Sequence, residues 1–151
     1  MRAQCFGGPK SSNSNKGNEE EEEDAWEREE ENEDEIECDL EAAKTWVYPV
    51  NLPKREYQYS VVRDALFENT LVCLPTGLGK TFIAAVVMLN YYRWFPAGKV
   101  VFVAHTRPLV RQQISACREI TGIPAAAMCE LTGQVKLAQR AECWRARRVF
   151  F

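Results

Sequence analysis

The chain has 151 residues, enough for one domain of ordinary size. Its net charge of −3 is unevenly distributed: residues 1–41 carry 16 acidic and 4 basic side chains, whereas residues 42–151 carry 6 acidic and 15 basic ones. The basic part favours a polyanionic partner such as a nucleic acid. No stretch resembles a signal peptide or approaches the ~18 apolar residues of a membrane span, which predicts an intracellular protein without a membrane partner.

The cysteine pattern argues against structural zinc. Six cysteines include no C-x-x-C pair, and His105 is the only histidine, so no zinc-ligand spacing exists. Cys73 and Cys117 fall at apolar positions, where we expect small buried thiols rather than disulfide partners.

Residues 1–41 are predicted to form a disordered acidic tail. They combine a Gly, Ser, Asn and Lys segment with a run of glutamates, and blocks of like charge repel one another and bury little apolar surface. The domain proper is then expected to span residues 42–151. A second hypothesis gives the tail a role of its own, as an interaction module that binds a basic partner.

The domain is predicted to begin with an extended apolar segment, residues 45–52, followed by a helix that reaches Phe67. Gln58 lies near the start of this helix, 22 residues before Lys80. A glutamine amide can both donate and accept a hydrogen bond, as recognition of an adenine edge requires.

A glycine-rich turn between a strand and a helix is the central motif. The apolar run 71–74 predicts a buried strand, and the apolar residues after Thr81 predict a helix to about Phe95. In this context a Gly-Lys-Thr sequence forms a phosphate site, because the glycines let backbone N–H groups surround an anion at a helix N-terminus. We expect Lys80 to reach the terminal phosphates of ATP and the Thr81 hydroxyl to hold Mg²⁺.

The complete nucleotide-binding set comprises Gln58 and the residues of the turn: Leu74, Pro75, Thr76, Gly77, Leu78, Gly79, Lys80 and Thr81. The full pattern G-x-x-x-x-G-K-[ST] requires Gly at the position of Leu74. The form found here is common in helicase-type motors, so the departure indicates a subfamily.

The remaining elements alternate between strand and helix. They are a strand at 99–104, a helix after Pro108 to about Thr121, a weaker strand at 125–131, a helix at 136–145 and a strand beginning at 147. This order predicts an α/β fold, a parallel sheet with helices on both faces. Ligands of such sheets bind at the carboxyl ends of the strands. Two polar pairs follow the second and third strands, and both suit a nucleic-acid backbone: Thr106 with Arg107, and Thr132 with Gly133.

Three segments together resemble the first, RecA-like lobe of superfamily 2 helicases, closest to the Fanconi anaemia complementation group M and archaeal Hef branch. They are Arg55-x-Tyr57-Gln58, the run LVCLPTGLGKTFIAAVVM, and VVFVAHTRPLVRQQ with Leu131-Thr132-Gly133. The resemblance covers roughly residues 45–151. It implies a nuclear, DNA-dependent ATPase that remodels forks and four-way junctions in DNA repair and has partners in a repair complex.

By this resemblance Gln58 corresponds to the adenine-reading glutamine, Lys80 and Thr81 to the catalytic phosphate and magnesium residues, and the two polar pairs to motifs that touch the tracking strand. The resemblance also implies that the lobe is incomplete, because the Asp-Glu-Ala-His box and the second lobe would lie after Phe151. One alternative stays open within the motors: a duplex-RNA translocase of the Dicer or RIG-I type.

Overall fold

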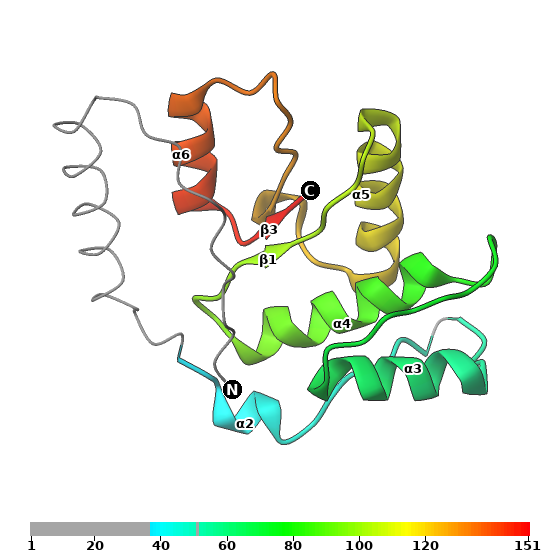
Figure 1. Cartoon of the computed structure of the whole chain (residues 1–151). Coiled ribbons are helices and arrows are strands. Elements are labelled where there is room, and N and C mark those ends of the chain that lie inside the picture. Colours follow the sequence, from blue (N-terminus) through cyan, green and yellow to red (C-terminus); the bar gives the residue numbers. More distant parts are fainter. Residues whose placement is uncertain (1–36, 51) are drawn as a thin grey trace, which may run out of the picture. The chain divides into compact units, whose positions relative to one another are not determined.

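A three-stranded parallel sheet lies at the centre of the computed structural model, which describes residues 37–50 and 52–151. The strands are β1 (Val100–Val101), β2 (Met128–Cys129) and β3 (Val149–Phe150), in the order β1-β3-β2. Figure 1 shows β1 and β3 side by side. Val149 pairs with Val100 on one side and with Met128 on the other. The last strand in the chain therefore lies in the middle of the sheet, as right-handed crossover connections allow.

The described residues form five α-helices and one 3₁₀ turn besides the sheet. Their bounds are α2 (Leu40–Ala43), α3 (Glu56–Phe67), α4 (Lys80–Trp94), α5 (Arg107–Thr121), the 3₁₀ turn η1 (Ala125–Ala127) and α6 (Leu137–Ala146). The helices α3 to α6 confirm the predictions made from apolar spacing. Helix α5 ends where predicted because Gly122 adopts a left-handed conformation, φ +66°, just after its last turn.

Helices cover both faces of the sheet, which confirms the predicted fold class. Successive side chains of a strand point to opposite faces. Val149 and Phe151 pack into a core with residues of α4 and α5, whereas the ring of Phe150 lies 4.5 Å from the ring of Trp144 on α6. Lys99 joins α6 to the sheet, since its Nζ donates to the carbonyls of Trp144 and Arg147, both at 2.7 Å.

A second core lies between α3 and α4. It contains Val62 and Leu66 of α3 together with Phe82, Ile83 and Val86 of α4. Helix α4 is thus buried by α3 on one side and by the sheet and α5 on the other. This explains why its apolar residues show no single stripe.

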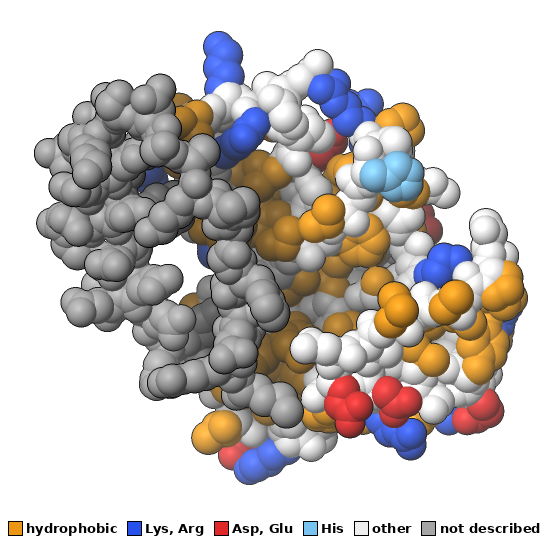
Figure 2. Space-filling view, viewed as in Figure 1, with side chains coloured by type: hydrophobic (Ala, Val, Ile, Leu, Met, Phe, Trp, Pro, Cys, Tyr) orange, Lys and Arg blue, Asp and Glu red, His pale blue; other side chains and the backbone are white. Residues whose placement is uncertain are grey.

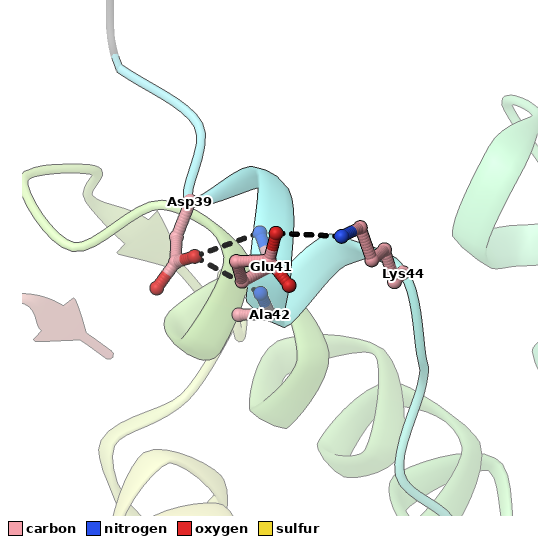
Figure 3. Close-up of polar contacts among 4 residues, drawn as sticks. All are labelled: Asp39, Glu41, Ala42 and Lys44. Carbon is pink, nitrogen blue, oxygen red and sulfur yellow. Dashed lines mark hydrogen bonds and ion pairs between the residues drawn. The ribbon is translucent and has the colours of Figure 1, made fainter.

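Helix α2 begins directly after Asp39, whose carboxylate accepts from the N–H groups of Glu41 and Ala42 at 3.1 and 2.9 Å (Figure 3). The Asp39 N–H donates to the Trp94 carbonyl at 2.7 Å and so links α2 to the end of α4. Residues 1–36 of the predicted disordered tail lie outside the described residues. Residues 37–41 are described, and the capped helix α2 crosses the boundary predicted after residue 41.

The strand predicted at residues 71–74 does not form. This segment runs into the phosphate loop without a strand partner among the described residues; Leu71 is 95% exposed, and Cys73 is exposed rather than buried. A cavity of about 580 Å³, lined by Val72, Ile83 of α4 and Val101 of β1, separates the segment from the sheet. A strand needs a neighbour about 4.8 Å away to complete its hydrogen bonds, and the sheet offers none at that position.

The other predicted strands are present but shorter. Among the described residues, strand pairing is confined to residues 100–101, 128–129 and 149–150, and the first half of the predicted strand at 125–131 is the turn η1. Figure 2 shows hydrophobic side chains gathered in a hollow near the middle of the viewed face, where β1 and β3 lie in Figure 1. No helix of the described residues is long and apolar enough to cross a membrane.

Candidate nucleotide and nucleic-acid sites

The glycine-rich turn forms an anion cradle at the start of α4. Gly77 and Gly79 have φ values of +85° and +84°, a left-handed conformation that favours glycine. Gly79 caps the helix, so α4 starts at Lys80. In the turn, residues 76–79, the Leu78 N–H alone donates to a described backbone carbonyl, that of Pro75 at 3.4 Å. The remaining N–H groups and the positive end of the helix dipole can therefore bind an anion.

Lys80 lies across this cradle. Its Nζ donates to the carbonyl of Leu74 at 2.6 Å and to that of Pro75 at 3.2 Å. Both acceptors are neutral carbonyls, whereas a phosphate oxygen is charged and makes a stronger, shorter hydrogen bond. An incoming phosphate can therefore replace these carbonyls as the partner of the ammonium group.

Thr81 provides a hydroxyl in the first turn of α4 and is half-buried. Its oxygen makes no side-chain hydrogen bond to a described residue. Mg²⁺ prefers oxygen ligands and keeps several waters. The described residues contain no group of three or more His, Cys, Asp or Glu side chains that could hold a metal ion. The Thr81 hydroxyl, in the first turn of α4 beside the cradle, fits an Mg²⁺ ion whose other ligands are phosphate oxygens and water.

Gln58 and Tyr57 hold the phosphate loop from α3. The Gln58 Nε2 donates to the Leu78 carbonyl at 3.1 Å, and the Tyr57 hydroxyl donates to the same carbonyl at 2.9 Å. Gln58 is only 6% exposed, and its amide lies against Gly79. The residue predicted to read adenine is therefore in direct contact with the residues predicted to bind phosphate.

The two predicted nucleic-acid pairs line one cavity. Thr106, Arg107, Thr132 and Gly133 all border a space of about 350 Å³ at the carboxyl ends of β1 and β2, with Trp144 also in its lining. The Leu131 N–H donates to the Phe151 carbonyl at 2.7 Å, which ties the second pair to the end of β3. The structure therefore brings the two pairs together at one edge of the sheet.

Thr106 caps α5 by its backbone alone. Its side chain makes no capping hydrogen bond, and Pro108 occupies the first turn of the helix. The hydroxyl and the first N–H groups of α5 are consequently open to a ligand at the helix N-terminus. Arg107 is exposed and adds a positive charge at the same place.

Sequence reasoning assigned no role to two residues that contact the predicted sites, Tyr57 and Arg140. The sequence signal that could have identified Tyr57 is its place in the Arg-x-Tyr-Gln motif, directly before Gln58. Arg140 lies on α6 and donates to the carbonyls of residues 132, 133 and 135, a set of contacts that apolar spacing cannot reveal.

The fold and the glycine-rich cradle define the class of this protein: a RecA-like α/β lobe with a phosphate loop. Residues 51–145 match the family model described as the type III restriction enzyme, res subunit. The structure is also similar to the solved helicase domain of Pyrococcus furiosus Hef, with a TM-score of 0.57 and 32% sequence identity over 64% of this chain and 20% of that one.

Three curated relatives cover similar shares of the chain. The Arabidopsis thaliana "DEAD-box ATP-dependent RNA helicase FANCM" is 62% identical over 75% of this chain and 9% of its own length. The Mus musculus "Fanconi anemia group M protein homolog" is 61% identical over 73% and 5%. The Schizosaccharomyces pombe "ATP-dependent DNA helicase fml1" is 57% identical over 76% and 14%.

The chain belongs to the type III restriction enzyme res subunit family and, within superfamily 2 helicases, to the Fanconi anaemia group M and Hef branch. It spans between 5% and 14% of the length of these three curated relatives.

Proposed function

We propose that the full-length protein is an ATP-dependent DNA helicase or translocase that acts on forked and four-way-junction DNA in DNA repair, and that this chain supplies its ATP-binding lobe. The observation that carries the proposal is the cradle at the start of α4. Two left-handed glycines leave its N–H groups open, and the Lys80 ammonium lies across it.

In the proposed complex with ATP, Lys80 exchanges the carbonyls of Leu74 and Pro75 for the terminal phosphates. Its positive charge offsets the charge that develops on the transferred phosphoryl group. Mg²⁺, held by the Thr81 hydroxyl and the phosphates, supplies further charge neutralisation when bound. The Gln58 Nε2 stays on Leu78, and its Oε1 accepts from the adenine amino group.

The cavity at the ends of β1 and β2 is the proposed nucleic-acid site. Thr106 and Arg107 offer a hydroxyl, a guanidinium and a helix N-terminus on one side, and the Thr132-Gly133 turn offers backbone N–H groups on the other. Such groups bind phosphates without reading the bases. This set suits a motor that must move along any sequence.

A Lys80→Ala variant of the full-length protein tests the proposal. We expect it to lose DNA-stimulated ATP turnover, because the cradle then lacks the ammonium group that lies across it. Lys44→Ala serves as the control, since Lys44 is an exposed surface residue paired with Glu41. Undiminished turnover in the Lys80→Ala protein would refute the assignment.

The second candidate is a duplex-RNA translocase, and it deserves a direct test because the name of the Arabidopsis thaliana relative specifies RNA and that of the fission yeast relative specifies DNA. Competition between forked DNA, a four-way junction and duplex RNA for the intact protein separates the two. We propose preference for the branched DNA, a nuclear location and association with repair proteins. Stronger competition by duplex RNA would favour the second candidate.

A third candidate is a non-catalytic interaction module in which the acidic tail binds a basic partner. Deletion of residues 1–41 from the full-length protein tests it. An unchanged set of bound proteins would remove this candidate, and loss of one partner with ATP turnover intact would favour it as an added role.

A further inference from the structure

The segment after β2 forms a tight turn at the mouth of the proposed nucleic-acid cavity. The Val135 N–H donates to the Thr132 carbonyl at 3.0 Å, as in a β-turn over residues 132–135. The Leu131 N–H, bonded to Phe151 at 2.7 Å, fixes the start of the turn against β3. The sheet thus holds one end of the turn only.

Arg140, the fourth residue of α6, holds the other end. Its Nε donates to the Val135 carbonyl at 2.8 Å, and its Nη2 donates to the carbonyl of Gly133 at 3.2 Å and to that of Thr132 at 3.5 Å. One planar guanidinium therefore satisfies three carbonyls of a four-residue turn. Lysine could not reproduce this, because its ammonium is a single donor centre.

These contacts decide where the N–H groups of the turn point. In a trans peptide the C=O bond and the following N–H bond point in opposite directions, and the described residues contain no cis peptide. With the carbonyls of Thr132 and Gly133 directed at Arg140, the N–H groups of Gly133 and Gln134 are directed away from it. Neither N–H donates to a described acceptor, so both are available to a ligand.

We propose that Arg140 is a positioning residue for nucleic-acid binding: it shapes the 132–135 turn so that the Gly133 and Gln134 N–H groups bind a backbone phosphate. The inference rests on the proposed function and deepens it. In this arrangement the phosphate lies on the side of the turn opposite Arg140, because the N–H groups that bind it point away from the guanidinium, whose Nε and Nη2 donate to the turn. Its contribution to affinity comes through backbone geometry rather than charge.

The test uses full-length Arg140→Lys and Arg140→Gln proteins, with Arg145→Gln as the matched loss of charge on the same helix. Arg145 is exposed and makes no side-chain hydrogen bond to a described residue. The dissociation constant for fluorescent forked DNA is measured over a range of salt concentrations. The DNA concentration that gives half-maximal ATPase stimulation is measured as well.

We expect both Arg140 variants to bind DNA about tenfold more weakly, which corresponds to about 1.4 kcal/mol. The slope of the logarithm of the DNA-binding constant against the logarithm of the salt concentration should equal that of the wild type. In the ATPase assay the DNA concentration for half-maximal stimulation should rise, while the rate of ATP turnover at saturating DNA should stay the same. Arg145→Gln should bind within about twofold of the wild type. Restored affinity in Arg140→Lys, or a slope smaller by about 0.9 in Arg140→Gln, would mean a direct phosphate contact and would overturn the proposal.

Hydrogen exchange in the DNA-free proteins tests the clamp independently of DNA binding. The Val135 amide, which donates to the Thr132 carbonyl in the turn, should exchange faster in both Arg140 variants than in the wild type and in Arg145→Gln, while the amides of α4 stay unchanged. Equal exchange in the turn would overturn the clamp. If the wild-type protein bound no DNA, the proposed function would fail, and the exchange result would still decide whether Arg140 shapes the turn.

Discussion

Gln58 occupies the space into which a side chain at Gly79 would project. A Cβ on residue 79 would overlap the Gln58 Nε2, which is itself bonded to the Leu78 carbonyl at 3.1 Å. Gln58, the residue proposed to read adenine, and the phosphate loop are therefore packed against each other without a gap. Neither residue can change without a response from the other.

Gly79→Ala should consequently impair nucleotide binding more than Gly77→Ala. Both positions have a positive φ, so each alanine costs about 1–2 kcal/mol in backbone strain. Only position 79 adds a steric clash, because a Cβ at position 77 meets no atom within 4 Å. Titration with a fluorescent ATP analogue measures the difference in affinity.

The double variant Gly79→Ala/Gln58→Ala is the control for this mechanism. Removal of the glutamine amide relieves the clash, so the second substitution should cost less in the Gly79→Ala background than in the wild type. If the losses of ATP-analogue affinity caused by the two single substitutions simply added in the double variant, the contact between residues 58 and 79 would have no effect on nucleotide binding.

Gln58→Glu should weaken ATP binding more than Gln58→Ala. A carboxylate cannot donate to the Leu78 carbonyl, so two oxygens would face each other at a site where the side chain is 6% exposed. Alanine merely leaves the carbonyl with the Tyr57 hydroxyl as its donor. The KM for ATP of the two variants gives the comparison, and a lower KM in Gln58→Glu would contradict it.

The helices were predictable because their signals are local. Helix α4 follows a glycine-rich turn and ends at Trp94, just before Pro96, and α5 ends at Gly122. Strands depend on partners far away in the sequence. The apolar run 71–74 has the composition of a strand, but no described strand pairs with it, whereas the short β3 pairs on both sides.

The predicted site residues were found through motifs, and the structure places them around one cavity and one glycine-rich turn. The residues that fix their positions were not predicted. Tyr57 and Arg140 act through carbonyls of residues 78 and 132–135. Such contacts depend on backbone geometry and leave no periodic pattern in the sequence.

Asn90→Leu should destabilise the fold. Asn90 is fully buried on α4, and its amide bonds both the N–H and the C=O of Val47 at 2.6 and 2.9 Å, as a neighbouring strand would. Leucine leaves both backbone groups without a partner, at a cost of about 2–3 kcal/mol. Urea unfolding followed by tryptophan fluorescence measures the loss. Asn69→Leu, at an exposed position, should change stability little, and equal effects of the two variants would argue against the role of the Val47 contact.

Stability should fall as the pH rises from about 9 to about 11, in part through Cys117. This thiol on α5 is 0% exposed, and burial raises its pKa from the ordinary 9.0 to about 11. Between these values the unfolded chain releases the thiol proton and the folded chain keeps it. The unfolded state then binds fewer protons, so the free energy of unfolding decreases by up to about 1.4 kcal/mol per pH unit.

Other groups titrate in the same range, so the decisive quantity is the difference between variants. Cys117→Ala should lose less stability between pH 8.5 and pH 10.5 than the wild type does, even if it is less stable at both. Cys73→Ala, which alters an exposed thiol, should keep the wild-type dependence. We expect the difference because Cys117 lies in the core between α4, α5 and β3. Parallel curves of unfolding free energy against pH for the wild type and Cys117→Ala would contradict the raised pKa, because they would mean that the thiol ionises as readily in the folded protein as in the unfolded one.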